Sequence, residues 1–141
     1  MEHVAIMKKS WGLLPKILSG EKKIESRWYK NKYSPWDKIK QDDFVYFKDS
    51  GCPVSLKAEV EKVIQVSDLN SERVREILNK YGKEDGIEDI SKFFELFKDK
   101  KYCMLIFLRK PQKIEPFDIN KKGFGAMSAW ITVENINQIK K

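Results

Sequence analysis

The alternation of apolar and polar residues is clearest between Val54 and Val66. One face of this segment, read as an extended chain, holds Val54, Leu56, Ala58, Val60, Ile64 and Val66. Lys62 is the only polar residue on that face, and polar residues fill most of the opposite face. A period of two predicts a half-buried β-strand, and this one is long enough to curve around a barrel.

Shorter segments predict further strands on either side of it. We expect them at His3–Met7, Lys23–Tyr29, Phe44–Phe47, Tyr102–Leu108, Lys113–Ile119 and Trp130–Val133. Phe44–Phe47 and Tyr102–Leu108 are apolar on both faces, which is typical of buried strands. Pro116 interrupts the strand expected after Tyr102–Leu108, so two separate strands are predicted there.

Helical spacing of apolar residues predicts the remaining elements. We expect helices at Ser10–Ser19, Ser71–Tyr81, Ile87–Lys98 and Glu134–Lys141. The first is a helix, or a turn followed by a helix, that stops at Gly20. Asp85 and Glu88 are placed to cap the third, whose aromatic side chains are interpreted as core. The order of elements predicts a mixed α/β (α+β) fold, a small β-barrel flanked by helices.

Positive charge is concentrated at the two ends of the chain. Its 141 residues include 28 Lys and Arg against 21 Asp and Glu, a net charge of +7. Residues 1–41 hold ten basic and four acidic residues (+6), residues 42–99 nine and fourteen (−5), and residues 100–141 nine and three (+6). If the two ends meet in the fold, they form one positive face that attracts phosphate groups. The alternative is a lysine-rich surface that serves solubility.

Composition disfavours several kinds of site and location. Cys52 and Cys103 are the only cysteines and His3 is the only histidine, so the spacing of a zinc site is absent and a His-based triad could use only His3. No apolar run approaches the ~20 residues of a membrane-spanning helix. The N-terminus lacks the order of a secretory signal. We therefore expect a cytoplasmic protein with no metal, no cofactor and no membrane partner.

A motif follows the first predicted helix. Residues 20–27 read Gly-Glu-Lys-Lys-Ile-Glu-Ser-Arg. They resemble the ASCH family (activating signal cointegrator homology), which belongs to the PUA-like group with the EVE and YTH domains. Its pattern Gly-x-Lys-x-x-Glu-x-Arg is matched at Gly20, Lys22, Glu25 and Arg27. The C-terminal part, from the strand at Tyr102–Leu108 through a Pro-Phe segment to Trp130, is similar to the family as well.

The resemblance implies both an architecture and a binding cleft. The architecture is a PUA-like β-pseudo-barrel forming one domain over residues 1–141, with a helical elaboration at about 70–100. The cleft lies beside the first helix and binds RNA, another single-stranded nucleic acid or a nucleotide. The residues expected there are Gly20, Lys22, Lys23, Glu25, Arg27, Trp28, Trp36 and Trp130. The predicted function is binding of a base, modified bases included, in a basic and aromatic cleft.

The side chains of the motif have chemistry that suits a nucleotide. Glu25 and Arg27 share one strand face, where Glu25 could accept from a base amino group and Arg27 could pair with phosphate or stack. The rings of Trp28, Trp36 and Trp130 offer stacking surfaces. The alternatives are a plain surface ion pair for Glu25 and Arg27 and a core position for Trp28. Trp36, in a polar loop, is the ring most expected to be exposed, and Trp11 is interpreted as packing.

Catalysis is a second hypothesis. Some ASCH members are amidohydrolases acting on acetylated cytidine and others are reported as nucleases, so a metal-independent nucleoside amidohydrolase or ribonuclease is the alternative. Lys22 would be the nucleophile or base if its pKa were lowered, Glu25 its partner acid or base, and Ser128 an assisting group. Lys23 and Glu25 stand where the amidohydrolase motif has two threonines, so the catalytic hydroxyl of that subgroup is absent. A third hypothesis is a protein-interaction adaptor that docks partners on the acidic helices of residues 71–98.

Overall fold

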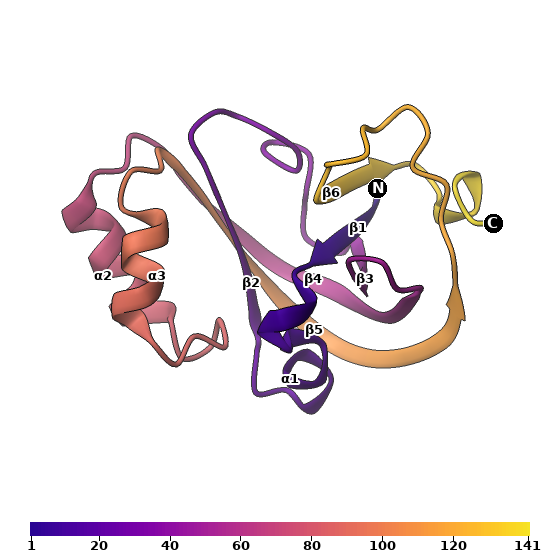
Figure 1. Ribbon diagram of the computed structural model, residues 1–141, viewed down its shortest axis with the longest axis horizontal. Helices are drawn as coiled ribbons and strands as arrows, with labels where there is room; N and C mark the ends of the chain where they lie inside the picture. The colour runs from indigo at the N-terminus through magenta and orange to yellow at the C-terminus, as the bar shows by residue number, and fades with distance from the viewer.

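A six-stranded sheet curled into a half-barrel organises the chain in the computed structural model, which describes residues 1–141 (Figure 1). Its strands are β1 (Glu2–Met7), β2 (Ile24–Tyr29), β3 (Phe44–Asp49), β4 (Val54–Val66), β5 (Tyr102–Phe117) and β6 (Trp130–Val133). Their order across the sheet is β2-β5-β4-β3-β1-β6, and β1 pairs with β3 in parallel. The predicted mixed α/β barrel is confirmed. Because β2 and β6 are the two edges of the sheet, the barrel has an open seam.

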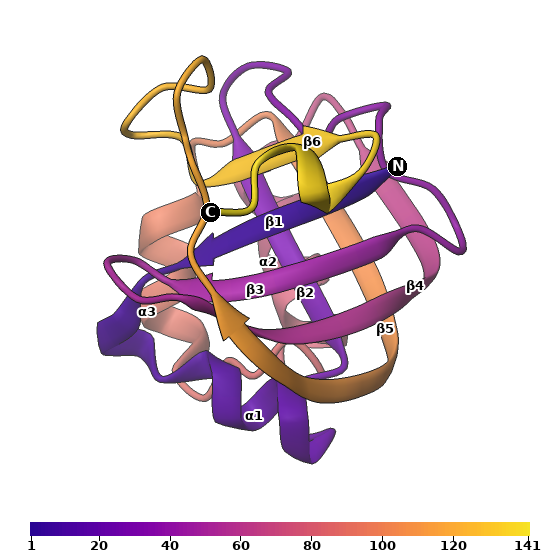
Figure 2. The same ribbon diagram turned by 90° about the vertical axis from the view of Figure 1, so that its right-hand side faces the viewer.

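The curvature of the sheet is concentrated in β4 and β5 (Figure 2). The alternation predicted for β4 is confirmed, since its apolar residues are buried from Val54 to Val60. The prediction of two strands between residues 102 and 119 was wrong, because β5 is one strand. Pro111 and Pro116 both fall where the register with β4 shifts. Proline lacks the N–H that a ladder needs, so such irregular positions accommodate it, and the irregularities bend the strand.

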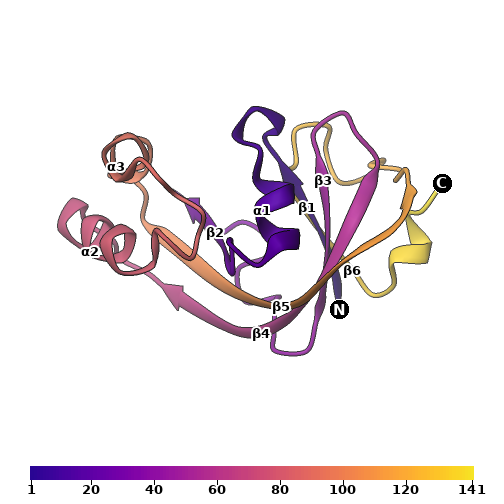
Figure 3. The same cartoon turned by 90° about the horizontal axis from the view of Figure 1, so that it is seen from below.

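Three α-helices pack on the sheet: α1 (Leu13–Ser19), α2 (Ser71–Tyr81) and α3 (Ile90–Phe97). Figure 3 shows α1 inside the arc of β4 and β5, and α2 with α3 at one end of that arc. The helix predicted from Ile87 begins three residues later, because Asp89 is the N-cap and accepts from the Lys92 N–H. The capping role predicted for Asp85 was therefore wrong, and its carboxylate instead accepts from Lys22.

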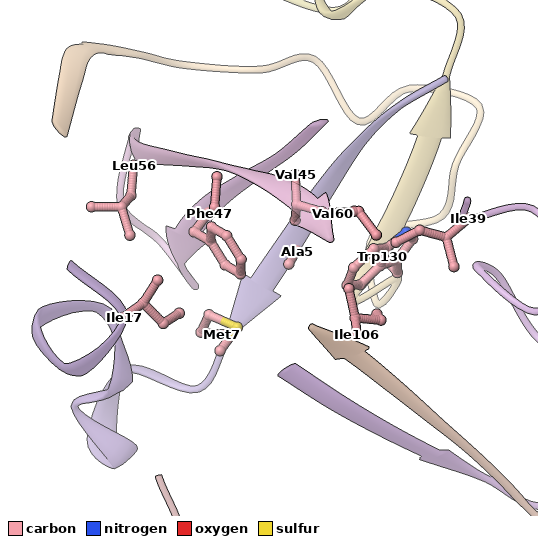
Figure 4. Packing of buried hydrophobic residues seen from close by; sticks show 11 residues of the cluster. Ala5, Met7, Ile17, Ile39, Val45, Phe47, Leu56, Val60, Ile106 and Trp130 are labelled. Carbon is pink, nitrogen blue, oxygen red and sulfur yellow. The ribbon is translucent and has the colours of Figure 1, made fainter. Parts of the chain in front are cut away.

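The main core lies between α1 and the inner face of the half-barrel. Its buried members include Met7, Ile17, Phe47, Ile106 and Trp130 (Figure 4). Burying a large apolar side chain of this kind contributes about 1.5–3 kcal/mol to stability, so the core fixes α1 against the sheet. Since β2 starts directly after α1, the core also fixes the beginning of β2.

The C-terminal segment differs from its prediction. In place of the helix expected at Glu134–Lys141, the chain forms a 3₁₀ turn at Ile136–Gln138. Ile136 and Ile139 are buried in a second apolar cluster with Val4 and Ile131, and this packing overrides a regular helix. None of the helices has the length and apolar character that crossing a bilayer requires.

Candidate functional site

The turn that follows α1 places the motif against the segment just before α3. Gly20 has a φ of 83°, a left-handed conformation that glycine adopts readily, and it ends α1. The backbone N–H of Lys22 then donates to Lys16 O at 2.9 Å. The N–H groups of Lys23 and Ile24 both donate to Glu84 O, at 2.7 and 3.0 Å. These bonds turn the side chain of Lys22 inward.

Lys22 is a buried cation between two carboxylates. Only 2% of its side chain is exposed. Its ammonium group donates to Asp85 Oδ1 at 2.6 Å and lies 3.3 Å from Glu25 Oε1. It also donates to the carbonyl oxygens of Asp85 and Ile24, at 2.6 and 2.7 Å. The site therefore satisfies this buried charge with an ion pair on each side, as buried charges require.

The electrostatics of this group keep Lys22 charged. Burial alone would lower the pKa of Lys22, but the carboxylates of Asp85 and Glu25 outweigh it and raise the pKa above its ordinary value. An ammonium group has no free electron pair, so Lys22 at neutral pH is a cation and not a nucleophile. It can hold a carboxylate or stabilise developing negative charge.

The two carboxylates beside Lys22 titrate in opposite directions. Burial would raise the pKa of Glu25, but Lys22 and Arg27 outweigh it and lower that pKa below its ordinary value. Burial, with the charge of Glu25 added, raises the pKa of Asp85 despite Lys22. Ser26 Oγ donates to Asp85 Oδ2 and accepts from the indole N–H of Trp28 at 2.9 Å. The polar network thus runs from Asp85 to the middle of β2.

Arg27 continues the network on the other side of Glu25. Its Nη2 donates to Glu25 Oε2 at 2.9 Å, and its Nη1 donates to Ala129 O at 3.3 Å. Its guanidinium carbon lies 5.0 Å from the centre of the Trp130 ring, a cation–π distance. Its Nε is buried and has no partner in the protein. A buried donor without a partner is costly, so this N–H is an unsatisfied polar group of the site.

A cavity of about 270 Å³ opens beside these residues. Glu25, Ser26, Arg27, Trp28 and Tyr29 of β2 form one wall, Met7, Trp11 and Leu13 another, and Phe97 of α3 and Ala129 close it. Trp28 and Phe97 are stacked, with ring centres 4.8 Å apart and planes 6° apart. A smaller cavity of about 50 Å³ continues from it to Lys22 and Asp85. The arrangement is an aromatic chamber with charged groups on one side.

The fold of the chain is similar to that of solved ASCH structures. A crystal structure of ASCH from Zymomonas mobilis matches 97% of this chain and 91% of that chain, with a TM-score of 0.67 and 16% identity. Two mutant forms of that protein match with TM-scores of 0.68 and 0.70, again at 16% identity over 97% of this chain and 93% and 91% of theirs. The chain has the ASCH fold. No model of a protein family matches the sequence, and no curated protein matches it.

The fold brings four of the predicted residues to the cavity or its extension. Glu25, Arg27 and Trp28 line the cavity, and Lys22 lies at its smaller extension. Trp130 is 4% exposed and contacts the cavity through Arg27. Gly20 shapes the turn and lines neither cavity.

Three further predicted residues lie away from the cavity. Lys23 is exposed and lines neither part of it. Trp36, expected as the most exposed ring, is half-buried and packs edge-on against Tyr102 at 5.1 Å. Ser128 donates from Oγ to Trp130 O at 2.9 Å and lines a neighbouring groove.

Three site residues escaped the sequence analysis. Asp85 was interpreted as a cap, and Trp11 and Phe97 were interpreted as packing, yet all three line the cavity or its extension. No local pattern marks Asp85, because its partner Lys22 is 63 positions away. For Trp11, the sequence offers one signal, the glycine that directly follows it. In the structure this residue, Gly12, has a φ of 59° and separates the 3₁₀ turn at Lys9–Trp11 from α1.

Proposed function

We propose that this ASCH-fold domain binds the base of RNA or of a nucleotide in the cavity beside β2. The observation that carries the proposal is Arg27, which lines an aromatic cavity and has a buried Nε–H without a protein partner. A ligand acceptor atom would satisfy that donor. Phosphate, a base carbonyl and a ring nitrogen are all suitable acceptors.

The size and walls of the cavity support a ligand of nucleoside dimensions. Its volume of about 270 Å³ is slightly below the ~300–1,000 Å³ of sites for drug-sized molecules. Trp11, Trp28, Tyr29 and Phe97 supply aromatic surface in its walls. Stacking of a base on such rings contributes roughly 1–3 kcal/mol per base and tolerates different bases.

The charged wall gives the cavity a preference among bases. Glu25 is ionised, because its pKa is lowered by Lys22 and Arg27 against the effect of burial. A carboxylate accepts hydrogen bonds and donates none, so it favours a base with an exocyclic amino group, such as cytosine or adenine. Lys22 and Arg27 hold this carboxylate in place through its two oxygens.

Hydrolysis in the same cavity is the second candidate. The observation that favours it is the pair of carboxylates, Glu25 and Asp85, whose pKa values are shifted in opposite directions. Such a pair is the usual arrangement of a general base and a general acid. In this scheme the charged Lys22 stabilises negative charge, and Ser128 has no part because it lies outside the cavity.

Replacement of one cavity tryptophan tests the binding proposal. We expect Trp11→Leu to weaken binding of cytidine 5′-monophosphate about tenfold, because one stacking surface is lost. Trp36→Leu is the matched control and leaves the affinity unchanged, because Trp36 packs on Tyr102 outside the cavity. Isothermal titration calorimetry measures both variants against the parent protein.

The outcomes separate binding from catalysis. Equal affinities for parent and Trp11→Leu protein, or equal losses in both variants, would contradict the assigned cavity. Chromatography of the ligands after incubation, with N-acetylcytidine and single-stranded RNA included, reports turnover. Unchanged ligands support a binding domain, and conversion in the presence of a chelator supports the hydrolase.

A further inference from the structure

A second hollow adjoins the cavity along the seam of the half-barrel. This groove has a volume of about 830 Å³. One side is formed by Tyr33, Ser34 and Lys38 of the loop after β2, and the other by residues 123–132. Tyr29 and Ala129 line both the groove and the cavity. The two hollows are therefore neighbours that share a wall.

The groove lies between the two edges of the sheet. β2 and β6 are the edge strands, and Tyr29 of β2 and Trp130–Thr132 of β6 contribute to its walls. An edge strand presents backbone N–H and C=O groups that no neighbouring strand uses. The loops after β2 and before β6 rise at the same end of the half-barrel (Figures 1 and 2). The open seam thus offers an extended ligand both a channel and polar backbone atoms.

Exposed aromatic rings stand in this groove. Tyr33 is 60% exposed and Phe124 is 38% exposed, although both are large apolar side chains. Tyr33 stands edge-on to Tyr29 with ring centres 5.8 Å apart, and Tyr29 extends the aromatic surface into the cavity. Aromatic rings that follow a groove in succession are typical of surfaces that stack consecutive bases.

The charge of the groove has the sign that phosphates require. Lys38 is the one charged residue in its lining, which includes no carboxylate. Lys38 lines the groove, donates to Ser34 Oγ at 3.0 Å and forms no ion pair. The two sides of the groove come from segments near the two ends of the chain, residues 29–38 and 123–132. Lys38 is a cation available to a phosphate.

From these observations we infer that the groove is a second nucleotide subsite, which holds the nucleotide adjacent to the base in the cavity. Tyr33 and Phe124 stack the neighbouring base, and Lys38 pairs with the intervening phosphate. The inference rests on the proposed function and narrows its ligand to a single-stranded oligonucleotide, because a base held in the cavity cannot be paired with a second strand.

Chain length of the ligand tests this inference. We compare cytidine 5′-monophosphate with a single-stranded oligocytidylate of about six nucleotides, within the ~4–16-nucleotide range of single-strand sites. The parent protein should bind the oligonucleotide at least about tenfold more tightly than the mononucleotide. The double variant Tyr33→Ala/Lys38→Ala should lose about tenfold for the oligonucleotide and nothing for the mononucleotide. For oligonucleotide binding by this variant, the slope of log K against log salt concentration should be shallower than in the parent by about 0.7.

The matched control changes the same kinds of side chain away from the seam. Leu96→Ala/Lys80→Ala removes an exposed apolar residue and an exposed lysine from α3 and α2, and should bind both ligands as the parent does. Equal affinity of the parent for the two ligands would overturn the second subsite, as would unchanged oligonucleotide affinity in the Tyr33→Ala/Lys38→Ala variant. Failure of the proposed function has a different signature: the mononucleotide does not bind, and Trp11→Leu leaves oligonucleotide affinity unchanged. That result overturns both.

Discussion

At the scale of single residues, Lys22 owes its role to Asp85. The pattern Gly-x-Lys-x-x-Glu-x-Arg places Lys22 near Glu25 and Arg27, and this proximity could be predicted from the sequence. The buried carboxylate of Asp85 could not, because it comes from the segment before α3 and contacts Lys22 at 2.6 Å. Gly86 makes this approach feasible, since a Cβ there would lie 3.3 Å from the Lys22 side chain. Lys22 is therefore a cation that organises the site.

Removal of this cation should destabilise the protein strongly. We predict that Lys22→Met lowers the free energy of unfolding by about 3–5 kcal/mol, because it leaves the buried Asp85 without a cation and Glu25 with Arg27 alone. Urea denaturation followed by tryptophan fluorescence measures the change. Lys16→Met is the control: its ion pair with Glu88 is exposed, so the expected loss is about 0–1 kcal/mol.

Neutralising the carboxylates should reverse part of that loss. Asp85→Asn added to Lys22→Met removes the carboxylate that has lost its cation, so the double variant should be more stable than Lys22→Met alone. A loss below about 1 kcal/mol in Lys22→Met would show that the ammonium is not what holds the two carboxylates.

At the scale of elements, the sequence predicts strands better than it predicts their ends. The alternation in β4 is strong because one face is buried, and it predicts both ends of the strand correctly. The break predicted in β5 followed from Pro116, but the register shifts against β4 accommodate that proline. Such shifts depend on the partner strand, so no local pattern reports them.

The helical pair shows the same limit for the site. The sequence predicts the apolar stripe of α3. Which residues of that stripe face β2 depends on how α2 and α3 pack at the end of the sheet. In the structure Phe97 stacks on Trp28 and closes the cavity. Residues 70–100 thus supply Asp85 and Phe97 to the candidate site, in addition to apolar core.

At the scale of the whole molecule, His3 links neighbouring segments at the β6 end of the sheet. Trp130 Nε1 donates to His3 Nδ1 at 3.1 Å, so Nδ1 is the acceptor and Nε2 carries the proton that it donates to Asp43 at 2.9 Å. Thr132 Oγ1 lies 3.0 Å from the same Nδ1. β1, β6 and the turn before β3 are joined through one neutral ring, which also positions Trp130 beneath Arg27.

This linkage predicts a pH dependence of stability. Burial lowers the pKa of His3 below 6.5, despite the opposing effect of Asp43. The unfolded chain therefore binds the proton more readily, so the contribution of His3 is fully present above pH 6.5 and decreases as pH falls below it. Urea unfolding between about pH 7.5 and pH 5 should show a lower midpoint at the acidic end.

His3→Gln provides the control for this prediction. Glutamine keeps a neutral hydrogen-bonding side chain and does not titrate, so the loss of stability between the two pH values should be smaller than in the parent. Identical losses of stability in the parent and in His3→Gln would show that other titratable groups cause the pH dependence.

The central claim is that the cavity between β2, Trp11 and Phe97 receives the nucleotide. The most direct measurement is a titration of ¹⁵N-labelled protein with cytidine 5′-monophosphate, followed through the indole N–H signals of the four tryptophans and the Arg27 Nε–H. We predict that the signals of Trp11, Trp28 and Arg27 shift together on binding while that of Trp36 stays in place. Shifts confined to Trp36, or binding that leaves Arg27 Nε–H unmoved, would contradict the account.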